Sequence, residues 1–339
     1  MLKKLMLAAA CVTCAGAPAA FAAGNTLVLG ASASPPMGAG PGKVFFVDTA
    51  AGTSHMAAFA RPGTPAGNSF YAAYDAASGT VYVPSPVGSI NMMNAATGAR
   101  IGAFPTIRGA RVARVLARRK LLVVLSAKTV AAYALGTHKP MFTLAVGGNA
   151  VAVNPSESVI YVGGNMDHTI TAIAVPAGQV KATYPVAQSG DLLLTGGNLF
   201  SADMKTGVMS VVNTANGKVT PIKTSEVDPH FAYSAIGKAT AGFMQMAASP
   251  GGHRVYVTGF SGHILEFAAA PAKYLGEMAV QPAKGANKLS GLAIVDGGKQ
   301  ALVTDENRDE ALLVSLADGK IMHVFPGVSS NRWVVVPTK

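Results

Sequence analysis

A short basic segment holds the residues best suited to bind an anion. Arg108, Arg111 and Arg114 recur every third residue in it, and a guanidinium group donates paired hydrogen bonds to a carboxylate or a phosphate. If the segment is a β-strand, Arg108 and Arg111 lie at one face of the domain, and Arg114 approaches a central channel. We therefore expect these arginines to contact an anionic ligand. The alternative is an ordinary solvated basic edge.

A long connection between residues 223 and 242 supplies a second set of candidates. It holds Glu226, Asp228, His230 and Tyr233. Long loops in compact domains are disproportionately functional, because closure of the fold does not require their extra length. We expect these four side chains to take part in ligand binding.

Three histidines are candidate metal ligands. His168, His230 and His263 fall in loops that we assign to one face of the domain, and imidazole nitrogens with nearby carboxylate oxygens suit a divalent metal. The histidines are scattered, without the spacing of a helical metal motif such as H-E-x-x-H. We therefore predict no cofactor, and a divalent metal at these histidines is the alternative.

The elements that position these residues follow from a repeat. Short apolar runs end in a turn at intervals of about 39 to 55 residues. The turns end at Gly52, Gly98, His138, Gly178, Gly217, Ala272 and Gly319. Repeats of this length that carry several short strands are typical of a β-propeller. We predict an all-β, seven-bladed propeller with four-stranded antiparallel blades.

The two ends of the chain complement each other. Residues 334–336 read as an innermost strand without outer partners, and residues 27–29 and 43–47 read as outer strands without an inner one. Pairing of the N- and C-terminal strands would close the ring and remove exposed sheet edges. We expect one propeller domain over residues 23–339.

The first 22 residues have the features of a secretory signal peptide. Lys3 and Lys4 precede an apolar stretch over residues 5–17 that is too short to span a bilayer, and a small-x-small cleavage site follows at residues 20–22. A lipoprotein signal that ends at Cys11 is the alternative. We expect a periplasmic or secreted protein.

Composition narrows the chemistry of the exported chain. Both cysteines, Cys11 and Cys14, lie in the predicted signal peptide. Once this peptide is removed, the chain can form no disulfide and has no thiol nucleophile, and it cannot bind zinc, an iron–sulfur cluster or c-type haem through cysteine. The formal net charge is +11 for the whole sequence and +9 without Lys3 and Lys4 of the predicted signal peptide, and this excess of positive charge favours anionic partners. No later stretch is apolar enough to cross a membrane as a helix, and neither a G-x-S-x-G elbow nor a Walker loop occurs.

One phrase of the sequence resembles a known repeat. Residues 249–259 read SPGGHRVYVTG and are similar to the SPDGKRVYVTN phrase of the YVTN-repeat propellers, which are WD40-like. Residues 161–165 and 303–305 match the same consensus more weakly. The resemblance implies an exported seven-bladed propeller, and this fold hosts many unrelated functions.

These observations favour a binding or scaffold module over an enzyme. The expected partner is an anionic ligand, a nucleic acid or a periplasmic protein. Few aromatic residues flank the arginines, so a nucleic acid that binds as a stacked single strand is the least supported of these three partners. The alternative function is a metal-dependent lactonase-like hydrolase, or the propeller subunit of a periplasmic redox enzyme.

Overall fold

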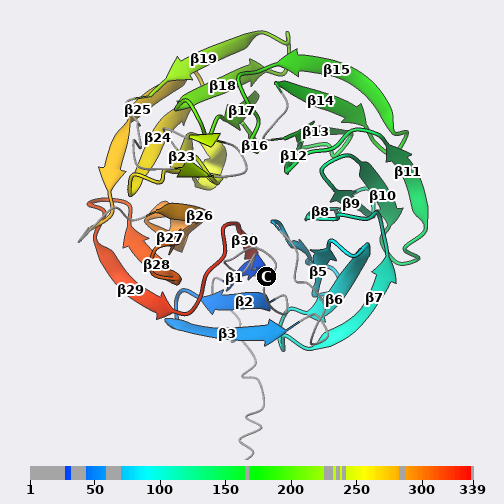
Figure 1. Ribbon diagram of the computed structural model, residues 1–339, viewed down its shortest axis with the longest axis horizontal. Coiled ribbons are helices and arrows are strands. Elements are labelled where there is room, and N and C mark those ends of the chain that lie inside the picture. Colours follow the sequence, from blue (N-terminus) through cyan, green and yellow to red (C-terminus); the bar gives the residue numbers. More distant parts are fainter. Residues whose placement is uncertain are drawn as a thin grey trace, which may run out of the picture.

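The chain forms a ring of β-sheets around a common centre (Figure 1). The structure, a computed structural model, describes residues 27–31, 43–58, 70–164, 168–224, 232–233, 237–238, 242–281 and 288–336. Seven four-stranded antiparallel sheets make up the ring, so the predicted seven-bladed propeller is confirmed. The predicted signal peptide lies outside the described residues. No helix of the described part is long and apolar enough to cross a membrane.

We number the blades in chain order and give each blade from its innermost strand outwards. Blade 1 holds β30 (Trp333–Val336), β1 (Leu27–Ala31), β2 (Lys43–Asp48) and β3 (Thr53–Ala58). Blade 2 holds β4 (Ala73–Asp75), β5 (Thr80–Ser85), β6 (Ser89–Asn94) and β7 (Arg100–Pro105). Blade 3 holds β8 (Val112–Leu116), β9 (Leu121–Leu125), β10 (Val130–Ala134) and β11 (Pro140–Leu144). Blade 4 holds β12 (Ala150–Val153), β13 (Val159–Gly163), β14 (Thr169–Ala174) and β15 (Gln179–Pro185).

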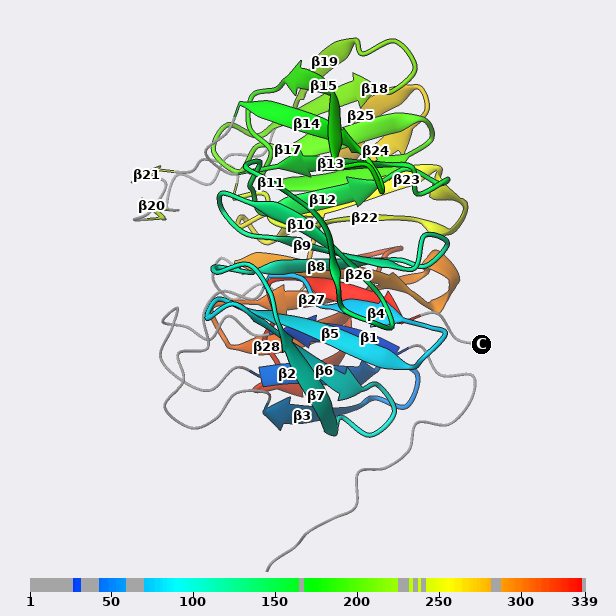
Figure 2. The ribbon, with the colours of Figure 1, turned by 90° about the vertical axis from the view of Figure 1, so that its right-hand side faces the viewer.

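The remaining blades follow the same order. Blade 5 holds β16 (Asp191–Thr195), β17 (Asn198–Ala202), β18 (Val208–Asn213) and β19 (Val219–Lys223). Blade 6 holds β22 (Met246–Ala248), β23 (Arg254–Thr258), β24 (His263–Ala269) and β25 (Ala272–Ala279), with the short 3-10 helix η1 (Pro250–Gly252). Blade 7 holds β26 (Leu289–Val295), β27 (Gln300–Asp305), β28 (Glu310–Ser315) and β29 (Ile321–Pro326), with η2 (Asp296–Gly298). A separate hairpin pairs β20 (Ala232–Tyr233) with β21 (Gly237–Lys238) and stands away from the ring in the side view of Figure 2.

The ring closes through strands from the two ends of the sequence. β30 pairs antiparallel with β1, with Val335 opposite Val28 and Val334 opposite Leu29. β1 then pairs with β2, and β2 with β3. The predicted closure through the terminal strands is therefore confirmed. It gives blade 1 four strands, as in the other blades.

The core is divided between the blades. Seven apolar clusters lie in the ring, one between each pair of neighbouring blades. Phe46 of blade 1 and Met93 of blade 2 are buried in one of them, and Phe200 and Phe267 connect blades 5 and 6 in another. Each sheet is therefore covered on both faces, which explains why the strands read as apolar runs with little alternation.

The repeated turns join the third and fourth strands of the blades and use a left-handed backbone. Gly52, Gly98, Gly178, Gly217 and Gly319 have φ between 65° and 73°, a region that glycine enters without steric cost. His138 takes the same conformation with φ 57° and stacks on Phe104 of the preceding blade at 4.2 Å. The repeat in the sequence thus marks where each blade contacts the outer strand of the blade before it.

Substitution of one such glycine should show how tightly these contacts fit. A Cβ atom on Gly319 would lie 2.1 Å from the carbonyl oxygen of Ala279, whereas nothing lies within 4 Å of a Cβ on Gly79, which has a similar φ. We expect Gly79→Ala to cost about 1 kcal/mol of unfolding free energy through its backbone conformation alone. Gly319→Ala should cost about 1–3 kcal/mol more, because backbone atoms must move. Urea unfolding of both variants measures the difference, and equal losses would contradict this packing.

Candidate functional site

One face of the ring carries four of the predicted site residues. In each blade, the loop between the second and third strands and the loop to the next blade lie on the same side, because the strands alternate in direction. We call this side the upper face. Arg108 and Arg111 precede β8, His168 precedes β14, and His263 begins β24, so all four are placed at the upper face. Arg118, Arg119 and Lys120 form the β8–β9 turn on the opposite side.

The three predicted arginines differ in their surroundings. Arg108 is exposed. The Nη1 atom of Arg111 donates to Oδ1 of Asn149 at 2.6 Å, and its guanidinium carbon lies 5.8 Å from the centre of the Phe70 ring. Burial lowers the pKa of Arg111, but an arginine side chain keeps its charge in proteins.

Arg114 also reaches the next blade. It projects from β8, and its Nη2 atom donates to the backbone oxygen of Val151 at 3.3 Å. Its guanidinium carbon lies 5.9 Å from the centre of the Tyr71 ring. Arg111 and Arg114 therefore connect blade 3 to blade 4 and lie over the aromatic pair that precedes blade 2, where hydrogen bonds and ring contacts hold the two guanidinium groups in place.

A buried carboxylate occupies the upper end of the innermost strand of blade 5. Asp191 is 2% exposed. Its Oδ1 atom accepts the hydroxyl hydrogen of Tyr71 at 2.7 Å, and its Oδ2 atom accepts the backbone N–H of Met246 at 2.7 Å. Burial raises the pKa of Asp191, and attraction to Arg332 and these hydrogen bonds offset part of that effect. Blades 5 and 6 and the segment before blade 2 thus meet at one carboxylate.

Arg332, like Asp191, is a residue of this region that sequence reasoning missed. It is 3% exposed, and its guanidinium carbon lies 5.6 Å from the centre of the Tyr71 ring and 6.0 Å from that of Phe70. Its Nη1 atom donates to the backbone oxygen of Asn331 at 2.7 Å. Among the residues that the structure describes, nothing accepts a hydrogen bond from its buried Nε atom.

A second carboxylate, that of Glu306, is attracted to Arg332. Glu306 is exposed as a residue, yet many protein atoms lie around its carboxyl group, and desolvation raises the pKa of that group. Attraction to Arg332 and to Lys288 opposes this rise. The backbone N–H of Glu306 also donates to the backbone oxygen of Lys288 at 2.9 Å.

Together these side chains form a compact group at the upper ends of the innermost strands. We call it the inner charge cluster, and its members are Arg111, Arg114, Arg332, Lys288, Asp191 and Glu306. They project from or beside β8, β16, β26 and β30, which are innermost strands, and β27, which is the second strand of blade 7. The innermost strands lie nearest the centre of the ring in Figure 1. The cluster holds four cations and two carboxylates, so its formal charge is positive.

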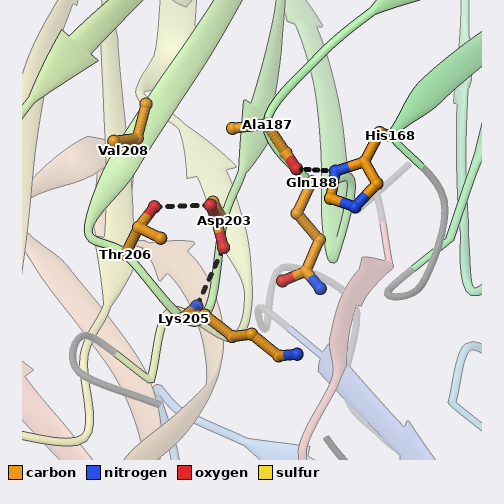
Figure 3. A pocket seen from close by; sticks show the side chains of 7 residues that line it. All are labelled: His168, Ala187, Gln188, Asp203, Lys205, Thr206 and Val208. Carbon is orange, nitrogen blue, oxygen red and sulfur yellow. Dashed lines mark hydrogen bonds between the residues drawn. The ribbon is translucent and has the colours of Figure 1, made fainter. Parts of the chain in front are cut away.

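A separate pocket lies between blades 4 and 5 at the upper face (Figure 3). It encloses about 360 Å³. His168 lies on one side of it, and Asp203 and Thr206 of the β17–β18 loop lie on the other. Lys205 and Gln188 also line it.

The other predicted site residues give no metal centre in the described part of the chain. Glu226, Asp228 and His230 lie outside the described residues, and only the backbone of Tyr233 is described, in β20. The described residues contain no group of three or more His, Cys, Asp or Glu side chains that could hold a metal ion. The Nδ1 atom of His263 lies 2.8 Å from the Ser261 hydroxyl. The metal site therefore stays a prediction that depends on His230.

Comparison with known proteins identifies the fold class. No family model matches the chain, and no curated protein sequence matches it. A structure of hydrazine synthase from Kuenenia stuttgartiensis is similar with a TM-score of 0.65 at 12% identity, covering 80% of this chain and 96% of that one. The periplasmic gluconolactonase of Pseudomonas aeruginosa is similar with a TM-score of 0.68 at 14% identity, covering 93% and 99%.

At these identities the similarity shows the fold alone. The chain is a seven-bladed β-propeller protein. Its membership of the YVTN-repeat family stays a prediction, based on residues 249–259 and the weaker matches elsewhere.

Proposed function

We propose that this protein is a non-catalytic binding module that holds an anionic ligand at the inner charge cluster. The excess of cations over carboxylates in the cluster is the observation that carries the proposal. Charges of one sign that converge between low-dielectric walls raise the local concentration of the opposite ion. A ligand that carries carboxylate or phosphate groups would neutralise the excess positive charge of the cluster.

The cationic groups are also fixed in position before a ligand arrives. Asn149 and the backbone of Val151 anchor Arg111 and Arg114, and the Phe70 and Tyr71 rings lie against the guanidinium groups. Each of these hydrogen bonds engages one of the several N–H donors of its guanidinium group. Ordering these side chains on binding would therefore cost little entropy.

The setting that we propose is the periplasm or the outside of the cell. The predicted signal peptide and the absence of cysteine after residue 22 support it. The proposed binding role requires no cofactor. Its ligand could be a free anion or the acidic surface of a periplasmic protein, and both present the same chemistry to the arginines.

Removal of the predicted arginines tests this function. We expect Arg108→Ala, Arg111→Ala and Arg114→Ala together to weaken binding of inorganic polyphosphate about tenfold or more, because two cations of the inner charge cluster and a third cation of the same face are lost. The dependence of affinity on salt should also flatten, since fewer counterions are released. Titration calorimetry over a series of salt concentrations measures both effects.

A matched triple variant separates position from net charge. Arg118→Ala, Arg119→Ala and Lys120→Ala together remove the same charge from the turn on the opposite side. We expect this control to bind polyphosphate nearly as well as the parent. Equal weakening by both triple variants would show that only net charge matters. Metal analysis of the same protein adds a further check, because stoichiometric bound metal would favour the hydrolase alternative.

A further inference from the structure

The pocket between blades 4 and 5 differs in chemistry from the inner charge cluster. Its volume of about 360 Å³ falls at the lower end of the range for small-molecule sites, about 300–1,000 Å³. Hydrogen bonds to backbone oxygens shape its wall: the backbone N–H of Val186 donates to the backbone oxygen of His168 at 2.9 Å, and the Ser201 hydroxyl donates to the backbone oxygen of Gln188 at 2.8 Å. The link between the two blades is therefore held in place.

His168 presents a hydrogen-bond acceptor at the pocket. Its Nδ1 atom is in hydrogen-bond contact with the backbone oxygen of Ala187 (Figure 3). A carbonyl oxygen can only accept, so Nδ1 carries the hydrogen, and in the neutral ring Nε2 has a lone pair. The partner of one ring nitrogen thus sets the tautomer and makes the other nitrogen an acceptor.

The opposite wall presents further acceptors. The carboxylate of Asp203 accepts the backbone N–H of Lys205 at 2.9 Å and the hydroxyl hydrogen of Thr206 (Figure 3). Because Thr206 gives its only hydroxyl hydrogen to Asp203, its oxygen is left to accept. The ammonium group of Lys205 is a donor in the same lining.

The charges of the lining cancel. Asp203 contributes one negative charge, and Lys205 contributes one positive charge. An anionic ligand would be attracted to Lys205 but repelled by Asp203, and a cationic ligand the reverse, so neither would gain a net attraction from the lining. A hydroxyl group can donate to His168 or Thr206 and can accept from Lys205.

We propose that this pocket binds a small, neutral, polyhydroxylated molecule of monosaccharide size. Its hydroxyl groups would donate to Nε2 of His168 and to the oxygen of Thr206, and one would accept from Lys205. The methyl groups of Ala187 and Val208, which also line the pocket, would contact its carbon framework. The pocket contains no residue of the inner charge cluster, so this proposal does not depend on the proposed function.

Three ligands that share one ring test the charge argument. Glucose is neutral, glucuronate is its anionic counterpart and glucosamine its cationic one. We expect calorimetry to show saturable binding of glucose with a dissociation constant near 1 mM, about −4 kcal/mol. The two charged sugars should bind at least about fivefold more weakly, because each places a like charge at the wall. Tighter binding of either charged sugar, or no binding of glucose, would overturn the proposal.

A pair of histidine variants locates the site. We expect His168→Phe to weaken glucose binding about tenfold by removing the acceptor. His263→Phe is the matched control, because His263 lies at the corresponding position of blade 6 on the same face. In the parent protein, the ¹⁵N resonance of His168 Nε2 should have the shift of an unprotonated nitrogen and should move as glucose saturates the protein. Equal binding by both variants, or a His168 resonance that does not respond, would overturn the assignment.

Discussion

Deletion of residues 331–339 is expected to abolish cooperative folding of the ring. It removes β30, so β1 loses its inner partner, and it removes the buried Trp333. Gln245 loses hydrogen bonds to the backbone N–H and oxygen of Trp333, both at 2.7 Å. Because the deletion opens a sheet edge and the core between blades 1 and 7 together, we expect a loss above about 4 kcal/mol.

Thermal unfolding followed by circular dichroism measures this loss. A chain that lacks only residues 337–339 is the control, because it keeps β30 whole, and it should melt like the parent. A chain without residues 331–339 that still melts cooperatively at the parent temperature would contradict closure through β30.

Asp191→Ala is expected to be the most damaging single substitution that we predict. It leaves the buried Tyr71 hydroxyl and the Met246 N–H without their acceptor, and it removes one of the two carboxylates that attract Arg332. Removal of one partner from a buried charged network costs about 3–5 kcal/mol. Chemical denaturation measures the loss, and Asp318→Ala, in an exposed turn, should have a much smaller effect.

The pH dependence of stability offers a second measure of Asp191. Its pKa is raised by burial in the folded protein, so between the ordinary value near 3.9 and the raised value the folded state binds more protons than the unfolded state. The contribution of Asp191 to stability therefore falls as the pH rises through this window. Asp191→Asn should remove this component. An identical pH profile in parent and Asp191→Asn would show that Asp191 does not titrate in this way.

The sequence allowed the blades to be predicted because each blade repeats a local requirement. A turn that needs positive φ selects glycine, and five of the seven predicted turn ends are glycines with that conformation. The complementary terminal strands could be predicted for a similar reason, since β30 lacked outer partners in its own segment and β1 lacked an inner partner in its own. A backbone conformation that most blades require therefore appears in a single sequence as a periodic pattern of residues.

The inner charge cluster could not be predicted in the same way. Arg114 was identified because it lies in a dense basic segment, whereas Arg332 and Asp191 are isolated in the sequence. Their contacts join segments that are more than a hundred residues apart, such as Tyr71 and Asp191. Only the closure of the ring brings them together. The sequence indicated the pocket only through His168 itself. The hydrogen bond of this histidine to Ala187 could not be predicted, because it depends on how two blades are joined.

The fluorescence of Trp333 tests the proposed anion site most directly. This residue is the single tryptophan of the chain, is buried, and directly follows Arg332 in the inner ring. Titration with inorganic polyphosphate should change its emission saturably, and the midpoint should move to higher polyphosphate concentration as salt is added. Polyphosphate binding detected by calorimetry with no change in Trp333 emission would contradict a site at the inner charge cluster.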